Sequence, residues 1–567
     1  MKKRMIGGCA RACLAGAVFG AACVAGLAAR ADDATTLYTL KWSYTGTEDF
    51  GTPSNWLMGE TVLDANGISS ATCTDVATRV PGAADIVRFG GAPKTGTDKT
   101  VRLSSDVVVS NFFYDVGEAM GTTLDLAGHT LTVSNNMSIK SGLVPPKTGG
   151  DPWLYKSRLT FKDGAVSLPG SQVGAKTYGQ PDEASSGFFL NRLQSSQGGF
   201  NLVFDNASLV ATNSLCSMTA QTKNMQGATS RIQLVNGASW TLSAFTFSCC
   251  DENSPIEFIA KGENTRLTIT NKLTIGSSAR IGLTFRDGAV LDAQYLSSSD
   301  GAYKAPSNSV VTFDGGSHAL GVAILSPNGA LRGSLNLSRA DLVVTNKAVL
   351  AAKSVVAARS AASITVCDGA SLTSDDSVQI GRMVQGANKG DWGGASLTVD
   401  DGSVVAAANL VFGYNETMSN DTLRVVGAKS LVKATTGYLS INYGSKVAFE
   451  IPTDGYAADD GVARVPVTAA GAIYSKTTAN CIPVALELST KAFDKAHPKQ
   501  KITLMQAGKT SVNDGSTYYT KDALAALTNN VTWVDNPRNH GELSISDDGL
   551  SLVYTASTPK GLMLVIR

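Results

Sequence analysis

Histidine is scarce in this sequence, with only four residues in a chain of 567. None of the four has a second histidine or a cysteine at the spacing of a metal site: His129, His318, His497 and His540. The sequence also lacks GxSxG, HExxH, a phosphate-binding glycine-rich loop with its lysine, and a calcium-binding loop. We therefore assign no catalytic, cofactor-binding or metal-ligating residue, expect no cofactor, and expect a protein that is not an enzyme.

Excess charge and long apolar runs are missing beyond residue 31. The formal net charge is +1 at pH 7, but residues 1–31 carry five basic and no acidic side chains. Without them, 43 basic residues face 47 acidic ones, a net charge of −4. This balance gives no electrostatic reason to expect nucleic acid as a partner. No later stretch is long and apolar enough to cross a bilayer as a helix, so we predict no transmembrane helix once residues 1–31 are removed.

Residues 1–31 have the pattern of a secretory signal peptide. A basic start, Lys2-Lys3-Arg4, precedes a run of small and apolar residues over 12–29. Ala29-Arg30-Ala31 then has the small-x-small form of a cleavage site. We predict that the chain is exported and acts outside the cell or on the outer cell surface.

Cysteine pairs at metal or redox spacing are also absent. Six cysteines follow the predicted cleavage site, without a CxxC motif: Cys73, Cys216, Cys249, Cys250, Cys367 and Cys481. One interpretation is that these are free thiols packed as small apolar groups. The other is a disulfide from Cys216 to Cys249 or Cys250, because these residues follow turns of neighbouring repeat units by similar offsets and export would allow oxidation.

One repeated pattern is present, most clearly over residues 392–451. Short alternating apolar runs precede a turn at Gly402, and a second copy leads to Gly427, 25 residues later. Turn glycines elsewhere recur every 25 to 27 residues: Gly237, Gly262, Gly288 and Gly315. Such a unit cannot bury its apolar face alone and must stack on its neighbours. Copies that run in the same direction predict an all-β solenoid of parallel strands.

The pattern divides the chain into four predicted segments. After the signal peptide (1–31) we predict an N-terminal cap region (32–114), β-helix repeats (115–451), and the end of the solenoid with a C-terminal cap (452–567). A short helix is expected near residues 521–527. Four residues stand just before their turns and are predicted to form an inward ladder: Phe285, Val366, Val399 and Val425.

The repeat resembles a known group of bacterial surface proteins. In the repeat, the resemblance rests on the residues Leu397-Thr-Val-Asp-Asp-Gly402-Ser-Val followed by Leu410-Val-Phe-Gly413. Near the start of the chain it rests on Trp42, Asn55-Trp56 and the stretch Pro81-Gly-Ala-Ala-Asp85. These are similar to repeats of autotransporter passenger domains and of PEP-CTERM-associated surface proteins. The resemblance implies a right-handed parallel β-helix at or outside a bacterial surface. Because no catalytic constellation is found, we expect such a protein to act as a stalk, an adhesin or a glycan-binding fibre, whose partner is an extracellular glycan or a host or cell-surface component.

Some parallel β-helices cleave polysaccharides, and paired carboxylates would be needed for that chemistry. Three adjacent pairs are candidates: Asp375-Asp376, Asp400-Asp401 and Asp459-Asp460. Adjacent residues of a strand point to opposite faces, and aspartate in turn-like sequence bonds to its own backbone, so we interpret all three pairs as turn residues. The alternative function is a polysaccharide lyase or glycoside hydrolase on the same scaffold.

Overall fold

The computed structural model describes residues 38–558, except for 44–47, 64–68, 71, 91–98, 117–120, 142–157, 171–186, 191–200, 221–229, 250–254, 277–279, 299–308, 321–333, 338–339, 358–361, 382–393, 414–419, 457–462 and 477–481. The described residues belong to one compact unit. The predicted signal peptide, the Asp459-Asp460 pair, Cys250 and Cys481 lie outside the described residues.

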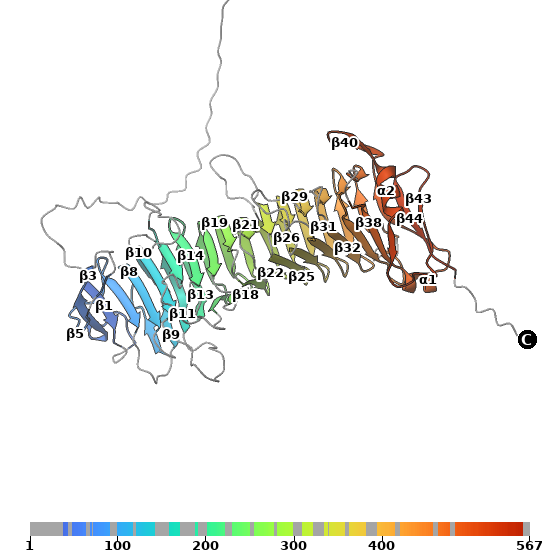
Figure 1. Cartoon of the computed structure of the whole chain (residues 1–567). Helices are drawn as coiled ribbons and strands as arrows, with labels where there is room; N and C mark the ends of the chain where they lie inside the picture. Colours follow the sequence, from blue (N-terminus) through green and yellow to red (C-terminus); the bar gives the residue numbers. More distant parts are fainter. Residues whose placement is uncertain are drawn as a thin grey trace, which may run out of the picture. The chain divides into compact units, whose positions relative to one another are not determined.

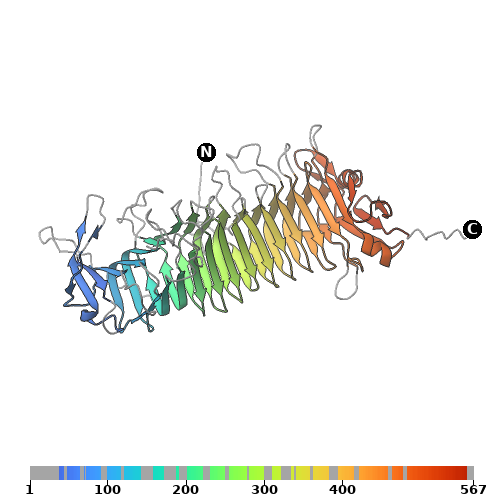
Figure 2. The same ribbon diagram turned by 60° about the horizontal axis from the view of Figure 1, so that its bottom comes forward.

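The described chain is predominantly β, which confirms the predicted class. One sheet contains 40 strands, and nearly all of its pairings between successive layers are parallel. Two short α-helices accompany it near the C-terminal end, α1 (Lys491–Ala496) and α2 (Thr520–Thr528). The second confirms the helix predicted near 521–527. Figures 1 and 2 show the colours changing in sequence order along the body, from blue at its N-terminal end to red at its C-terminal end.

The parallel pairings form three ladders. The first ladder contains β7 (Lys99–Arg102), β9 (Gly121–Asp125), β11 (Arg158–Ser167), β13 (Asn201–Ala211), β15 (Ser230–Val235), β18 (Ile256–Lys261), β20 (Ile281–Arg286), β22 (Ser309–Asp314), β25 (Ala340–Thr345), β28 (Ser363–Val366), β30 (Ser396–Val399), β32 (Thr422–Val426), β35 (Lys446–Glu450), β38 (Ala485–Ser489) and β42 (Val531–Trp533).

The second ladder follows the turn. It contains β8 (Val107–Val116), β10 (Thr130–Ser141), the later halves of β11 and β13, β16 (Ser239–Leu242), β19 (Arg266–Ile275), β21 (Val290–Ser298), β23 (Ser317–Leu320), β26 (Val349–Ala352), β29 (Ser371–Ile380), β31 (Val404–Phe412), β33 (Leu431–Ala434), β36 (Val467–Ala469) and β39 (Lys501–Ala507).

The third ladder uses the later halves of the long strands. It contains β1 (Tyr38–Trp42), β6 (Ile86–Gly90), the ends of β8 and β10, β12 (Gly187–Leu190), β14 (Leu215–Ala220), β17 (Phe245–Cys249), the ends of β19 and β21, β24 (Ser334–Leu337), β27 (Ser354–Ala357), the ends of β29 and β31, β34 (Leu439–Ile441) and β37 (Ile473–Tyr474). The register shifts where β10, β19 and β29 pass from the second ladder to the third.

Antiparallel pairing occurs only near the two ends of the described sheet. At the start, β2 (Trp56–Glu60) pairs antiparallel with β1 and with β5 (Asp75–Val76). At the end, β44 (Ser551–Thr555) pairs antiparallel with β39 and with β43 (Glu542–Ile545). The short hairpins β3–β4 (Val62–Leu63, Ser69–Ser70) and β40–β41 (Ser511–Asn513, Thr517–Tyr519) form separate two-stranded sheets, and one 3-10 turn spans Pro53–Asn55.

The turn between the first and second ladders explains the glycine period. Asn236 and Gly237 have positive φ angles of 56° and 84°, and Asp401 and Gly402 have 46° and 74°. Such consecutive left-handed residues favour asparagine or aspartate followed by glycine. Amide side chains also bond to carboxylates one unit away, at donor–acceptor distances of 2.8, 2.7 and 3.1 Å: Asn206 to Asp163, Asn236 to Asp205 and Asn346 to Asp314.

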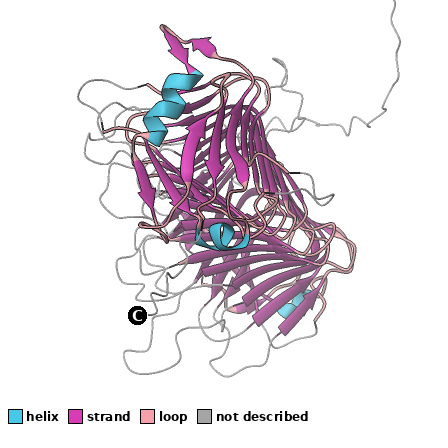
Figure 3. Ribbon diagram, turned by 90° about the vertical axis from the view of Figure 1, so that its right-hand side faces the viewer, coloured by secondary structure: helices cyan, strands magenta, loops and turns pink. Residues whose placement is uncertain are grey.

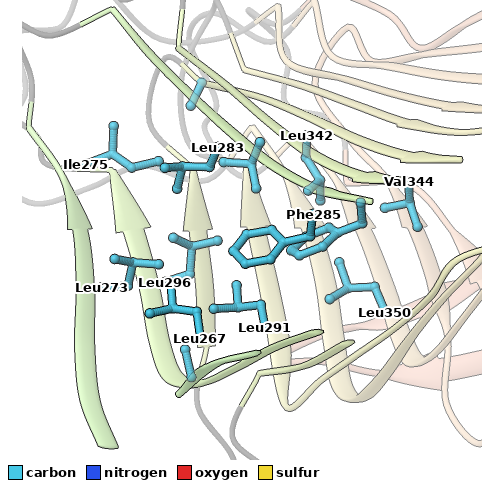
Figure 4. Close-up of a cluster of buried hydrophobic side chains, with 14 of the residues drawn as sticks. Leu267, Leu273, Ile275, Leu283, Phe285, Leu291, Leu296, Leu342, Val344 and Leu350 are labelled. Atoms are coloured by element: carbon cyan, nitrogen blue, oxygen red, sulfur yellow. The ribbon is translucent and has the colours of Figure 1, made fainter. Parts of the chain in front are cut away.

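The predicted inward ladder is confirmed. The side chains of Phe285, Val366, Val399 and Val425 are all 0% exposed. Register pairs connect them through Phe313 and Val344, which continue the same row from β20 to β32. Figure 4 shows Phe285 among Leu267, Leu283, Leu291 and Leu342, all pointing into one interior. Each such side chain stabilises the fold by roughly 1.5–3 kcal/mol through burial.

The disulfide hypothesis is wrong for Cys216. This residue carries a free thiol that is buried beside Ala211 and Ser214. The register places Cys249 opposite Ala220, four residues further along the strand than Cys216. Four residues of strand span about 13 Å, which is too far for a disulfide. Burial raises the pKa of the Cys216 thiol to about 12, which suits the free, packed thiol of the other interpretation.

Candidate functional site

Most described phenylalanines and several tyrosines, including Tyr474 and Tyr554, are buried in the core. Phenylalanines on inward positions are fully buried, as at Phe285 and Phe313. Three tyrosines near the C-terminal end instead reach the surface: Tyr438 and Tyr518 are half-buried, and Tyr519 is 54% exposed. A phenol carries a hydroxyl group that needs a partner, so it suits positions with one apolar side and one wet side.

Three tyrosine rings form a row in this region. Tyr438 immediately precedes β34, Tyr474 ends β37, and Tyr518 lies in the hairpin strand β41. The rings of Tyr438 and Tyr474 have centroids 5.1 Å apart and an interplanar angle of 65°, and those of Tyr474 and Tyr518 are stacked with centroids 5.3 Å apart. We call these three residues, together with Lys476 and Asp514, the tyrosine cluster.

The strands bring the cluster together from distant parts of the sequence. Parallel pairing of β34 with β37 sets Ser440 opposite Tyr474, which puts Tyr438 and Tyr474 on neighbouring layers. The hairpin β40–β41 then carries Tyr518 and Asp514 across the end of this ladder. Figures 1 and 3 show this hairpin projecting next to helix α2.

An ion pair lies beside the rings. The Nζ atom of Lys476 is 2.6 Å from Oδ2 of Asp514, and the hydroxyl group of Tyr474 donates to the same oxygen at 2.9 Å. The ammonium group also lies 5.7 Å from the ring centroid of Tyr518, within the range of a cation–π contact. Both charged side chains remain partly open, with exposures of 29% for Lys476 and 41% for Asp514.

The pKa values of these groups keep the pair charged and the phenol neutral. Hydrogen bonds from Lys476 and Tyr474 lower the pKa of Asp514. Burial alone would lower the pKa of Lys476, but its hydrogen bond and charge interaction with Asp514 raise it overall. Burial raises the pKa of Tyr474, and the nearby Asp514 adds to that rise. The cluster therefore has no net charge over the ordinary pH range.

This arrangement offers two kinds of contact to a ligand. Tyr474 is only 2% exposed, so the half-buried rings of Tyr438 and Tyr518 are the apolar surfaces against which the C–H groups of a sugar ring can pack. The ammonium group has three donors and the carboxylate has further lone pairs, so both can bond hydroxyl groups while remaining paired. The cluster does not supply the two carboxylates that glycoside hydrolysis uses, since its single carboxylate is engaged by Lys476 and Tyr474.

Two of the three carboxylate pairs considered from the sequence lie among the described residues, at different positions of the layer. Asp400 and Asp401 form the turn after β30, where the backbone N–H of Asp401 donates to Oδ1 of Asp400 at 2.7 Å. Asp375 and Asp376 are exposed residues within β29, so their interpretation as turn residues was wrong. They stand at the register shift between Ser374 and Ser377, where the strand bends from one ladder to the next.

The histidines are separate from one another and from the tyrosine cluster. His318 is buried in the apolar row of the second ladder, where Nδ1 accepts from the backbone N–H of Leu291 at 3.2 Å and Nε2 lies 2.8 Å from Gly315 O. Burial lowers the pKa of His318. His129 and His497 lie near single aspartates, and His540 stacks on Trp533 with ring centroids 3.8 Å apart. Within the described ranges, no group of three histidine, cysteine, aspartate or glutamate side chains could hold a metal ion.

One buried carboxylate was not found from the sequence. Asp421, just before β32, is 0% exposed. Its Oδ1 atom accepts from the backbone N–H of Ala395 at 3.0 Å, and its Oδ2 atom bonds to no described residue. Burial raises the pKa of Asp421 to about 6, against the opposing effect of the Ala395 and Gly394 backbone groups. No periodic pattern marks this position, because its neighbours in the ladder are small or polar.

Among the described residues, neither α-helix is long and apolar enough to cross a bilayer. No family model matches the chain, and no curated protein or solved structure matches it.

Proposed function

We propose that this chain is a non-catalytic, secreted or cell-surface bacterial protein that binds an extracellular glycan through the tyrosine cluster. In this proposal the three ladders are the faces of a right-handed parallel β-helix, and residues 1–31 direct its export. The scaffold acts as a fibre that holds the cluster near its C-terminal end.

The tyrosine cluster is the observation that carries this proposal. It places the half-buried rings of Tyr438 and Tyr518 against the buried ring of Tyr474 and beside an ion pair, in a fold whose described phenylalanines mostly fill the core. Aromatic rings provide contact area at small entropic cost, because a tyrosine has only two side-chain torsions to fix. Partly exposed polar groups beside the rings can then select among hydroxyl-bearing ligands.

The charge balance of the cluster favours a neutral glycan. Lys476 is already paired with Asp514, so its charge is not free to attract carboxylate or sulfate groups. An anionic polysaccharide would also be repelled by the mature chain, because its net charge is −4. A neutral polysaccharide can place the apolar face of a sugar on a ring and bond its hydroxyl groups to the ion pair.

A glycan array with the purified mature chain tests the proposal. We expect binding to neutral glycans, strong loss for Tyr518→Ala, and little change for Tyr519→Ala. Tyr519 is a matched control, because it is the adjacent tyrosine but has no ring contact with the cluster. No binding to any glycan, or equal loss for both variants, would contradict the proposal.

A reducing-sugar assay on the same glycans separates the proposal from its alternative. We expect binding without release of new reducing ends. Release that depends on the protein would instead favour the polysaccharide-cleaving function.

A further inference from the structure

A buried carboxylate joins three segments at the C-terminal end of the described fold. Asp494, on α1, is 4% exposed. Its Oδ1 atom accepts from the hydroxyl group of Tyr554 at 2.6 Å and from the backbone N–H of Ser557 at 3.1 Å. Its Oδ2 atom accepts from Oγ1 of Thr490 at 2.9 Å and from Nδ2 of Asn536 at 3.3 Å. Each oxygen atom therefore has two donors, which hold the carboxylate in one position.

The Oδ2 atom of Asp494 brings a nucleophile next to an amide. A hydroxyl group that donates to a carboxylate has a base within reach of its proton, which is how serine and threonine are activated as nucleophiles. The carboxamide of Asn536 can supply the electrophile, because its nitrogen can leave as ammonia. That nitrogen also donates to Asn539 O at 2.7 Å. Both of its partners are acceptors, so the nitrogen of the carboxamide, and not its oxygen, faces Asp494.

A second carboxylate fixes the two segments against each other. Asp535, adjacent to Asn536, accepts at Oδ1 from the backbone N–H of Thr490 at 2.9 Å. Its Oδ2 atom accepts from the hydroxyl group of Ser489 at 2.7 Å and from the backbone N–H of Lys491 at 3.1 Å. The end of β38 and the segment after β42 are thus held as neighbours, which removes most of the entropic cost of a reaction between them.

We propose that Thr490 and Asn536 form an ester cross-link in the mature protein, with Asp494 as the proton carrier. Oδ2 of Asp494 takes the proton of Thr490 as Oγ1 attacks Cγ of Asn536. The same oxygen then delivers this proton to Nδ2, the Cγ–Nδ2 bond breaks, and ammonia leaves. An ester bond replaces the amide bond, so the atoms balance without a further reactant. The reaction occurs once, on the protein's own chain, and is therefore distinct from the turnover of a substrate.

Burial would preserve such a bond and give it a structural use. Thr490 is 0% exposed and Asp494 is 4% exposed, so water has little access to the ester that would form there. The bond ties the end of β38 to the segment that follows β42. It therefore fastens the last layer of the first ladder, near the end of the described fold, where a chain opens most readily.

Peptide mapping of the full mature chain by mass spectrometry tests this inference. We expect a peptide pair joined between residues 490 and 536, with a mass about 17 Da below that of its two parts because ammonia is lost. Thr490→Val removes the nucleophile but keeps the shape of the side chain, and should lose the joined pair. The matched control Thr490→Ser keeps the hydroxyl group and should form it.

Asp494→Asn tests the proton carrier. The carboxamide cannot take the proton of Thr490, so the joined pair should form roughly 100-fold more slowly or more in the folded variant. Circular dichroism checks the fold of each variant. Hydroxylamine cleaves esters, so it should separate the joined pair after denaturation of the unchanged chain, a result that needs no variant.

Four outcomes would overturn the inference. The first is recovery of residues 490 and 536 in separate, unmodified peptides of the folded, unchanged chain. The second is a joined pair that persists in Thr490→Val. The third is a joined pair that resists hydroxylamine. The fourth is recovery of residue 536 as aspartate without a link, because the ester would then not survive.

Discussion

Asp421 provides a quantitative test of how the ladders are packed. Its carboxyl group is fully buried, with one oxygen bonded to the backbone N–H of Ala395 and the other bonded to no described residue. A Cβ atom on Gly381 would lie only 1.9 Å from that second oxygen, so the carboxyl group fills a niche that requires glycine. A carboxylate in this niche loses its hydration and gains only backbone dipoles in return.

The effect of Asp421 on the free energy of unfolding can be calculated from the shift in its pKa. The pKa of Asp421 rises from 3.8 to about 6 on folding, which corresponds to about 3 kcal/mol because one pKa unit is about 1.4 kcal/mol. Since the folded pKa is the higher one, the native state binds more protons between these two values. The free energy of unfolding contributed by this group is therefore highest below about pH 3.8 and falls as the pH rises through about 6.

Urea titrations of the wild-type chain and Asp421→Asn across this window measure the effect. The amide can still accept from Ala395 but cannot ionise. We expect the stability of Asp421→Asn relative to wild type to increase by about 3 kcal/mol between about pH 3.5 and about pH 7. A difference that stays constant over this range would refute the assignment of a buried, perturbed carboxyl group.

Ser309 supplies a matched control for that experiment. Its Oγ atom accepts from the backbone N–H of Ile281 at 3.1 Å, which is the corresponding bond on an earlier layer. Ser309→Ala removes the same kind of backbone cap without a titrating group. Its effect on the free energy of unfolding should therefore not change with pH.

Further predictions concern the core. Val399→Asp places an unpaired charge in the inward ladder and should cost about 3–5 kcal/mol, so an unchanged melting temperature would contradict the register. Gly381→Ala should destabilise the fold strongly at every pH, because φ is +82° and the niche is filled by Asp421; a loss under about 0.5 kcal/mol would disagree with that packing. Because the pKa of His318 is lowered, its contribution to the free energy of unfolding is complete above about pH 6.5 and weakens as the pH falls. The stability of His318→Leu relative to wild type should therefore increase as the pH falls from about 8 to about 5. Circular dichroism melts at both pH values check this, and a pH-independent difference would oppose it.

The repeated part of the fold could be predicted from the sequence because its physics is local. Alternating apolar residues determine which side chains point inward, and Asn-Gly or Asp-Gly pairs supply the left-handed turn residues, as at Asn236 and Gly237. Together these features predicted the inward position of Val399 and Val425. The same local pattern says nothing about sites where separate segments meet.

The tyrosine cluster shows why the candidate site could not be predicted. Tyr438, Tyr474 and Tyr518 are 36 and 44 residues apart, and only the hairpin β40–β41 brings the last ring onto the ladder. Their separation matches no repeat period. The disulfide hypothesis for Cys216 failed for a related reason. It compared the number of residues from each turn to the cysteine, but the connections between the second and third ladders differ in length from one layer to the next.

Isothermal titration of a neutral glycan selected from the array tests the central claim most directly. Binding at the tyrosine cluster should be lost in Tyr518→Ala and retained in Tyr519→Ala. It should also change little between about 0.05 M and about 0.5 M salt, because the cluster has no net charge. Undiminished binding by Tyr518→Ala, or affinity that falls steeply with salt, would contradict the account.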